Sequence, residues 1–423
     1  SNITQKLESK GAVIYYNHDK GNINNPDAVI YTAAIKDNNP ELVKARSLDI
    51  PIIDRATLLG LLMKKYPHSI AVSGTHGKTT TTSMIAMVML EYGLDPTVHI
   101  GGELEYIGGT TRIGGNDYFV TEADEYYESF LKFYPYIAVI LNIEFDHADY
   151  YKDIEHVKSS FLKFTNLVPK DGYVVVCADD ISISSIMDKI TANKITYGIN
   201  TDTYTWSAKN ILFDMSGCAV YTLLKEGKEI DSIKLNVPGI HNVYNSLAAI
   251  AASYLAGCSI VGIKRGLCKF TGTHRRFELK GIFNNIKVID DYAHHPSEIK
   301  ATLKAAKGSN HSRIWCVFQP HTYTRTKTLL NEFAVSFSDA DTVIVSDIYA
   351  ARELDNGEIN SKALVGKINE AGGRAIYLKD FDTITEYLKN SSLPGDLIIT
   401  MGAGDIYKVG ELLLKETHTK AVV

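Results

Sequence analysis

The sequence lacks the features that mark membrane, secreted and nucleic-acid-binding proteins. No apolar run approaches the roughly 18 to 20 residues that a bilayer crossing needs, and the first residues lack the basic and then apolar order of a secretory signal. The 44 basic and 49 acidic residues are interspersed, so we expect neither a nucleic-acid partner nor membrane insertion. The five cysteines include no C-x-x-C pair, which favours buried thiols in a reducing compartment over disulfides. We therefore expect a soluble, cytoplasmic protein.

The chain is long enough for several domains. Its 423 residues exceed one ordinary core, and a prior of roughly 150 residues per domain suggests about three domains. Short β-branched runs alternate with helical stretches along the whole sequence, which is typical of α/β proteins with parallel sheets. We predict domains at residues 1–67, 68–275 and 276–423.

The expected elements follow a strand and helix rhythm in all three blocks. In the first block we expect strands at residues 12–16, 28–33 and 50–53, and helices at 40–47 and 56–66. In the second we expect strands at 69–72, 118–121, 137–141, 173–176 and 235–237, and helices at 79–91, 154–166 and 243–256. In the third we expect strands at 286–289, 314–318, 342–346, 375–378 and 397–401, and helices at 297–306, 326–337 and 361–370. The third block shows no hairpin signal, so we predict a doubly wound open sheet.

A glycine-rich turn stands between the first strand and first helix of the second block. It consists of Gly74, Thr75, His76, Gly77, Lys78, Thr79 and Thr80. Glycines let the backbone approach phosphate oxygens, and a helix N-terminus attracts an anion. Lys78 would neutralise the β and γ phosphates of a nucleotide, and Thr79 would offer its hydroxyl to Mg²⁺. The alternative, a plain turn followed by a surface lysine, is disfavoured by the flanking strand and helix.

Carboxylates and histidines follow two further predicted strands. Glu122 and its acidic neighbours follow residues 118–121, and His147 ends an acidic segment after residues 137–141. Each segment alone is more often a solvated loop, but two of them at the same sheet edge favour a two-metal phosphoryl-transfer site. Glu122 would bridge a metal to the γ-phosphate, and His147 would hold a second ion. The later pair His294 and His295 lacks the spacing of a closed zinc site.

Three arginines are candidates for binding phosphate or carboxylate groups. Guanidinium forks pair bidentately with such oxygens, although an isolated arginine is usually a surface residue. Arg275, Arg276 and Arg325 stand out because of their neighbours.

Several of these segments together resemble the Mur ligase family. They are residues 74–80, 122–125, 142–147, 238–245, 275–277 and 290–296, and the resemblance covers nearly the whole chain. Residues 318–326 and 347–353 resemble the C-terminal signatures of the members that add alanine. The members that attach a recycled tripeptide to the same sugar nucleotide are a close alternative. A folate-type glutamate ligase fits less well, because it does not share the segment 321–325.

The resemblance implies a three-domain α/β architecture. It consists of an N-terminal Rossmann-like UDP-binding domain, a central P-loop ATPase domain and a C-terminal doubly wound Rossmann-like domain. The implied activity is the ATP-dependent joining of L-alanine to UDP-N-acetylmuramate through an acyl phosphate in peptidoglycan synthesis, with Mg²⁺ as the metal. A monomer or a weak homodimer is expected. A nucleotide-binding protein without turnover is the alternative from another class.

The resemblance also implies roles for individual residues. Lys78 and Thr79 would bind ATP phosphates and Mg²⁺, and Glu122 and His147 would hold metal ions. The adenine would contact His241, Asn242 and Asn245, and the C-terminal domain would reach the nucleotide through Arg276 and Asp291. The amino acid and the muramyl carboxylate would face Tyr292, His294 and Arg325. The implied catalytic set is Lys78, Glu122, His147, Arg276, His294 and Arg325.

Two departures from the family pattern affect these expectations. The family begins with a glycine-rich turn that holds the uridine diphosphate, and no such turn precedes the predicted strand at residues 12–16, so we expect the first domain to lack its beginning. Members often carry arginine where Thr322 stands, so one carboxylate-binding group is expected to be absent or supplied elsewhere. Some relatives support the second metal with a carbamylated lysine, a role that we assign to neither Lys158 nor Lys163.

Overall fold

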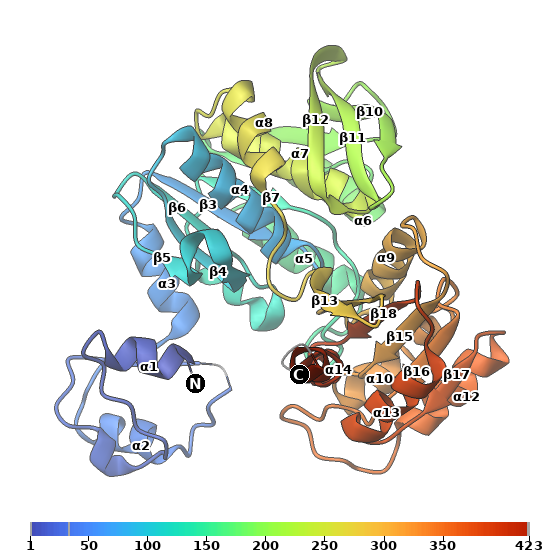
Figure 1. The fold of residues 1–423 in the computed structure, drawn as a ribbon. Coiled ribbons are helices and arrows are strands. Elements are labelled where there is room, and N and C mark those ends of the chain that lie inside the picture. Colours follow the sequence, from blue (N-terminus) through green and yellow to red (C-terminus); the bar gives the residue numbers. More distant parts are fainter. Residues whose placement is uncertain (1, 33, 421–423) are drawn as a thin grey trace. The chain divides into compact units, whose positions relative to one another are not determined.

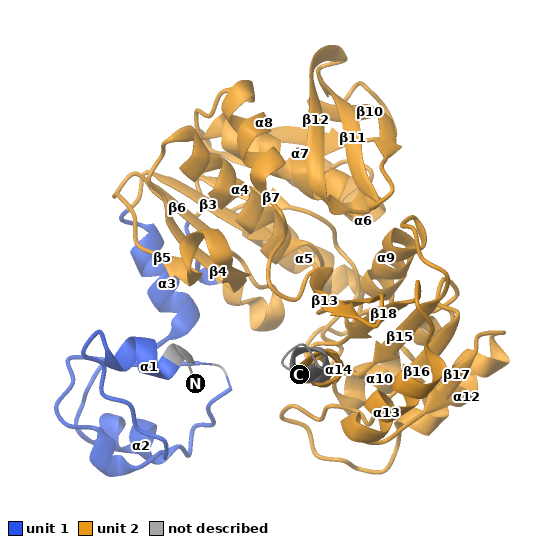
Figure 2. Cartoon of the chain, in the orientation of Figure 1, with its two compact units in different colours: residues 1–65, 132–134 blue, residues 66–131, 135–423 orange. Residues whose placement is uncertain are grey.

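The computed structural model describes residues 2–32 and 34–420 (Figure 1). The chain forms two compact units (Figure 2). Unit 1 contains residues 1–65 and 132–134, and unit 2 contains residues 66–131 and 135–423. Among residues 2–32 and 34–420, no helix has the length and apolar character that a membrane crossing requires.

Unit 1 is built around a short parallel pair of strands. Strand β1 (Val29–Tyr31) pairs with β2 (Ile52–Asp54), and the helices are α1 (Asn2–Glu8), η1 (Lys20–Asn22), α2 (Pro40–Ser47) and α3 (Arg55–Met63). Helix α2 begins where predicted, because the Asn39 side chain accepts the Glu41 and Leu42 N–H groups and Pro40 fits the first helical position.

One predicted strand of unit 1 is wrong. Residues 12–16 form exposed coil, and Val13 and Tyr16 are 74% and 80% exposed. Strand propensity depends on packing against neighbouring strands, and these side chains have almost none. Residue 33, at the end of the predicted strand 28–33, lies outside the described residues.

The first sheet of unit 2 has a parallel centre with antiparallel pairing at both edges. Its order is β12-β11-β10-β9-β8-β7-β3-β6-β4-β5, in which the β4–β5, β10–β11 and β11–β12 pairs are antiparallel. The strands are β3 (His68–Ser73), β4 (Thr97–Leu104), β5 (Gly109–Arg112), β6 (Tyr118–Glu122), β7 (Ile137–Ile140), β8 (Tyr173–Cys177), β9 (Asn193–Gly198), β10 (Trp206–Phe213), β11 (Cys218–Lys225) and β12 (Lys228–Pro238).

Helix α4 (Lys78–Tyr92) is buried along most of its length. It packs against α7 (Ile240–Leu255), α8 (Ile260–Lys269) and strands of the sheet (Figure 1). All its residues from Thr81 to Met89 are buried, so the turn that precedes α4 has a rigid support. The remaining helices of this part are η2 (Glu105–Ile107), η3 (Tyr126–Lys132), α5 (Ile154–Thr165), α6 (Ile181–Ile186) and η4 (Met187–Lys189).

The second sheet of unit 2 has the order β13-β14-β18-β15-β16-β17. All its pairs are parallel except β13–β14. The strands are β13 (Glu278–Phe283), β14 (Ile286–Asp291), β15 (Ile314–Phe318), β16 (Thr342–Val345), β17 (Ala375–Tyr377) and β18 (Leu397–Met401). The helices are α9 (Pro296–Lys307), α10 (Tyr323–Thr328), α11 (Leu330–Ala334), α12 (Ser361–Glu370), α13 (Phe381–Ser391) and α14 (Tyr407–Lys420).

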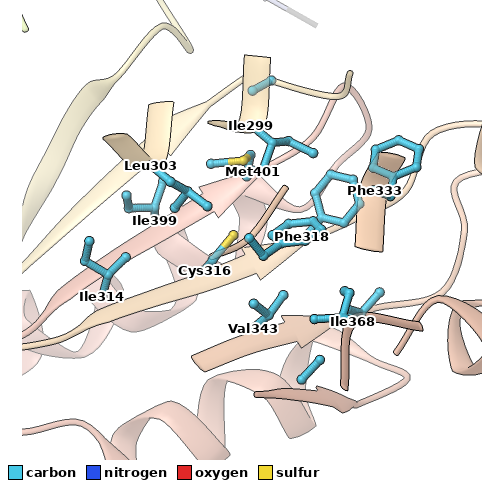
Figure 3. Close-up of a cluster of buried hydrophobic side chains, with 14 of the residues drawn as sticks. Ile299, Leu303, Ile314, Cys316, Phe318, Phe333, Val343, Ile368, Ile399 and Met401 are labelled. Carbon is cyan, nitrogen blue, oxygen red and sulfur yellow. The ribbon is translucent and has the colours of Figure 1, made fainter. Parts of the chain in front are cut away.

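The second sheet carries apolar clusters built from alternate side chains of its strands. One cluster includes Cys316, Phe318 and Ile399 together with Leu303 and Phe333 from the helices (Figure 3). The other includes Trp315, Val317 and Ile398 and packs against α13 and α14. Because successive side chains of a strand point to opposite faces, these clusters require helices on both faces, as in a doubly wound sheet. The predicted α/β fold class is confirmed.

Some details of the second sheet differ from the prediction. Strands β13 and β14 form a hairpin whose turn residues, Asn284 and Asn285, both have positive φ (48° and 63°). Asparagine tolerates this conformation, so the Asn-Asn pair was a hairpin signal that we missed. The helix predicted at residues 326–337 is two short helices, because Leu329 leaves helical geometry (φ −105°, ψ 24°) between α10 and α11.

Candidate active site

The glycine-rich turn lies between β3 and α4 and forms a cradle for an anion. Gly74 and Gly77 have φ of 142° and 83°, and a Cβ at Gly77 would lie 2.6 Å from the side-chain oxygen of Asn245. No other residue fits there without displacing Asn245. The His76 N–H donates to the Asn142 side chain at 2.8 Å, which fixes the turn against the end of β7. The helix N-terminus behind the turn favours a phosphate.

Lys78 is the first residue of α4, and most of its side chain is buried among carboxylates. Its amine donates to Glu125 at 2.8 Å and to the Thr75 carbonyl at 3.2 Å. Burial alone would lower the pKa of Lys78, but the carboxylates of Glu125, Asp124 and Glu122 raise it above its usual value. Lys78 therefore carries a positive charge beside the cradle.

Glu122 ends β6 close to the start of α4. Its carboxylate accepts the Thr79 hydroxyl at 3.2 Å and the Gly101 N–H at 2.6 Å. Burial raises the pKa of Glu122, although Lys78 and Arg276 oppose the shift. The hydroxyl of Thr79 and the carboxylate of Glu122 are close enough to share one divalent cation.

A second group of possible metal ligands contains Asp124, Glu125 and His147. Their ligand atoms lie within 4.8 Å of one another. The ring of His147 packs against Tyr126 with the centroids 4.4 Å apart and the planes tilted by 33°, which limits its orientation. Two carboxylates and an imidazole suit a divalent cation. Glu125 was not among the predicted site residues, although it stands in the acidic segment that the sequence singled out.

A cavity of about 340 Å³ adjoins the glycine-rich turn. Its lining includes most residues that were predicted to bind the nucleotide: His76, Gly77, Thr80, His241, Asn242, Asn245, Arg276 and Asp291. The predicted residues Gly74, Thr75, Lys78 and Thr79 belong to the adjoining turn and do not line it. The structure thus gathers residues of the first sheet, α7 and the second sheet around one nucleotide-sized space.

Burial controls the charge of two cavity residues. It lowers the pKa of His241 to about 4, so this imidazole is neutral near pH 7. It raises the pKa of Asp291 to about 6, against the effect of Arg276 and of the N–H groups of Ala293 and Phe277. A neutral imidazole suits stacking with a base, and a carboxylate fixed by two N–H groups can accept hydroxyl donors.

The residues predicted to face the amino acid also lie together. Arg325 forms three hydrogen bonds of 3.0 to 3.1 Å with Asp146, and both side chains are buried. Burial would raise the pKa of Asp146, but the guanidinium holds it well below its usual range. His294 lies edge-on to Tyr292 with ring centroids 5.5 Å apart, and burial lowers its pKa to about 3. Arg325 is thus a charged group and His294 a neutral one.

The hydroxyl of Ser297 joins the glycine-rich turn to α9. It lies 2.7 Å from His295 and 3.2 Å from His76, and it donates to Glu144. The ligand atoms of these three residues are close enough together to bind one metal ion. However, the Ser297 hydroxyl oxygen already contacts all three. We therefore interpret the group as a hydrogen-bond network. The sequence signal that we missed is Glu298, which caps α9 three residues after His295.

His76 should make stability depend on pH. Burial would lower its pKa, but Glu298 and Glu144 raise it from 6.5 to about 10. The folded protein then keeps a proton that the unfolded chain loses, so the stabilising contribution is complete below pH 6.5 and is lost as the pH rises towards 10. We expect the thermal stability advantage of the wild type over His76→Gln to shrink across this range. The exposed His68→Gln is the control, and an advantage that is constant with pH would refute the prediction.

Family models for Mur ligases match three successive parts of the chain. The model described as Mur ligase family, catalytic domain matches residues 1–67. The Mur ligase middle domain matches residues 72–253, and the model described as Mur ligase, glutamate ligase domain matches residues 275–404.

Individual relatives agree with these matches. A UDP-N-acetylmuramate–L-alanine ligase of Acetivibrio thermocellus is 64% identical over 100% of this chain and 90% of the relative. One from Caldanaerobacter subterraneus is 53% identical over 98% of this chain and 90% of the relative. The structure resembles the crystallised UDP-N-acetylmuramate-alanine ligase of Thermotoga maritima, with a TM-score of 0.83 and 30% identity over 99% of this chain and 92% of that chain. It also resembles a murein peptide ligase of Psychrobacter arcticus, with a TM-score of 0.73 and 26% identity over 97% and 90%. The family indicated by the sequence motifs is confirmed, and the chain belongs to the Mur ligase family.

Proposed function

We propose that this protein uses ATP to join L-alanine to UDP-N-acetylmuramate, giving UDP-N-acetylmuramoyl-L-alanine, ADP and phosphate in peptidoglycan synthesis. The observation that carries the proposal is 64% identity, along the whole chain, with a UDP-N-acetylmuramate–L-alanine ligase. The site adds a second support, because a phosphate cradle and a carboxylate-binding arginine lie in one compact unit. The use of ATP and a nucleotide sugar favours a cytoplasmic location.

The first step makes the muramyl carboxylate electrophilic. One of its oxygens attacks the γ-phosphorus of ATP, and the bond to the ADP oxygen breaks as the new O–P bond forms. The glycine-rich turn would orient the phosphates, and Lys78 would exchange its contact with Glu125 for the β and γ oxygens. His241, Asn242, Asn245 and Asp291 would hold the nucleoside in the cavity.

Mg²⁺ is the metal that the ligand sets fit. The Thr79 and Glu122 pair and the group of Asp124, Glu125 and His147 offer mainly hard oxygen ligands. A bound cation would neutralise charge on the phosphate oxygens. Both sets border the glycine-rich turn, since Lys78 contacts Glu125 and Thr79 contacts Glu122.

The second step forms the amide bond. The unprotonated amine of L-alanine attacks the carbonyl carbon of the acyl phosphate, the bond to phosphate breaks, and the nitrogen gives up a proton. Arg325 would orient the amino acid through its carboxylate, and the neutral His294 adds no competing charge. The contact between Arg325 and Asp146 joins the loops around the site, which would limit the access of water to the acyl phosphate.

The three matched segments suggest a division of labour. We propose that residues 1–67 contribute to binding of the uridine diphosphate group and that residues 68–275 provide most of the ATP site. Residues 276–423 would bind the amino acid and complete the ATP site through Arg276 and Asp291. The matches to the three successive family models support this division.

A coupled assay of ADP formation tests the function. We expect ADP only when UDP-N-acetylmuramate, L-alanine and Mg²⁺ are all present, and none after a chelator removes the metal. A much higher rate with the tripeptide L-alanyl-γ-D-glutamyl-meso-diaminopimelate than with L-alanine would instead identify a murein peptide ligase. Nucleotide binding without ADP formation for any substrate pair would indicate a binding protein.

A further inference from the structure

We propose that Arg352 binds the carboxylate of the acceptor amino acid together with Arg325, and that it thereby sets the affinity for this substrate. The inference rests on the proposed ligase function. It assigns a substrate-binding role to a residue that was not among the predicted site residues.

Arg352 lies in a loop that is fixed against the start of α10. The loops that follow β15 and β16 leave adjacent parallel strands, in which Phe318 pairs with Val345. The Thr322 N–H donates to the Tyr349 carbonyl at 2.9 Å, and the Thr324 N–H donates to the Glu353 carboxylate at 2.9 Å. Tyr349 and Glu353 flank Arg352 in the sequence, so these two bonds hold its loop against the segment that carries Arg325.

The guanidinium of Arg352 lies over the ring of Tyr126, which contacts the proposed metal ligand His147. Its central carbon lies 5.2 Å from the centre of the Tyr126 ring. The same ring packs against His147, and its hydroxyl donates to Asp149 at 2.5 Å. Among the residues that the structure describes, Arg352 forms no ion pair. The aromatic face therefore positions a cation whose N–H groups remain available to a ligand.

Two arginines, Arg325 and Arg352, lie near His321, and their charge partners differ. Arg325 is balanced by Asp146, and one of its nitrogens lies 3.2 Å from the His321 ring. Burial, followed by Arg325, lowers the pKa of His321 to about 4, and Arg352 acts in the same direction. A neutral imidazole thus stands near two guanidinium groups, and in the described part of the chain only Arg325 of the two is paired with a carboxylate. A carboxylate bound at this point would supply the missing negative charge.

The amino acid, rather than the muramyl group, suits this position. The muramyl carboxylate must approach the γ-phosphate, where Lys78 and the proposed cation sites provide positive charge. The amine attacks the resulting carbonyl, and its carboxylate does not react, so it can extend towards the loops of the second sheet. Arg325 lies at the start of α10, which follows the loop after β15, and Arg352 lies in the loop after β16.

Thr322 does not bind the carboxylate in this arrangement. Its hydroxyl accepts the Arg325 N–H at 3.3 Å as the N-cap of α10, and its φ is 65°. The side chain is therefore used in holding Arg325. The carboxylate-binding group that the sequence did not show at position 322 is supplied by Arg352 from the neighbouring loop.

Initial-rate kinetics of Arg352→Gln test the proposal. At saturating UDP-N-acetylmuramate and MgATP, we expect KM for L-alanine to rise about 10- to 100-fold, as for the loss of a charge-assisted hydrogen bond. KM for the other two substrates should stay within about twofold, since their proposed contacts are elsewhere. The control is Arg374→Gln, which removes the same charge from an exposed residue before β17, at the opposite end of the strands.

A second measurement separates binding from a structural effect. L-Alaninamide lacks the carboxylate, so the wild type should prefer L-alanine to it, and Arg352→Gln should lose most of that preference. Arg352→Lys should recover part of the affinity for L-alanine. Equal KM for L-alanine in Arg352→Gln and Arg374→Gln, or a rise in KM for UDP-N-acetylmuramate instead, would overturn this inference alone. Failure of the wild type to form ADP would overturn the proposed function and the inference with it.

Discussion

Replacing Lys78 with alanine is expected to reduce ADP formation about a thousandfold or more, because the residue would neutralise the phosphate oxygens as their charge develops. The ammonium group is buried and remains charged beside Glu125. Neither the glycine turn nor the helix N-terminus can replace a full positive charge. The measurement is kcat in the coupled ADP assay at saturating substrates.

The same substitution should also destabilise the protein, and a second variant separates the two effects. Removing Lys78 leaves Glu125 buried without its partner, which typically costs about 3–5 kcal/mol. The double variant Lys78→Ala, Glu125→Gln should recover much of the stability but none of the activity. Lys209→Ala, which removes an exposed partner of Glu229 on β10, should resemble the wild type in both. Activity of Lys78→Ala above a tenth of the wild-type value would contradict the proposed role.

Arg325→Ala should lower kcat/KM for L-alanine by about a hundredfold or more. It removes the guanidinium that would bind the carboxylate, and it leaves Asp146 as an unpaired buried charge. KM for ATP should change little, because Arg325 does not line the nucleotide cavity. Varying each substrate in the ADP assay measures these quantities.

Arg313→Ala is a matched control for Arg325→Ala. Arg313 also pairs with a buried carboxylate of the second sheet, Asp396, but it precedes β15 at the opposite end of the strands. We expect it to lower thermal stability without changing KM for L-alanine. If both variants changed that KM equally, the effect of Arg325 would be one of folding rather than of substrate binding.

The sequence predicted the central parts of both sheets better than their edges. Strands β15 and β18 and helix α12 have the predicted bounds, because continuous apolar runs and caps determine them locally. Strands β4, β5, β9 and β13 were missed, and so were β10 and β11. Their pattern is weak, and much of β10 is exposed. The β11–β12 turn was also missed. In the structure it contains Glu226 and Gly227, which both have positive φ.

The contacts that define the site could not be predicted in the same way. The motifs located the phosphate turn and the acidic segments, but the pairing of Arg325 with Asp146 joins residues 179 positions apart. Such a pair depends on the packing of one sheet beside the other, which no local pattern records. The role proposed for Arg352 has the same origin, because its neighbour Tyr126 belongs to a distant segment.

Asp146 and His147 are consecutive residues with different partners, and this adjacency links two binding events. Asp146 holds the arginine that would receive the amino acid, and His147 belongs to a group that fits a cation. A shift of this short segment by either ligand would change the site of the other. If the bound cation raises the affinity for the amino acid by some factor, the bound amino acid must raise the affinity for the cation by the same factor.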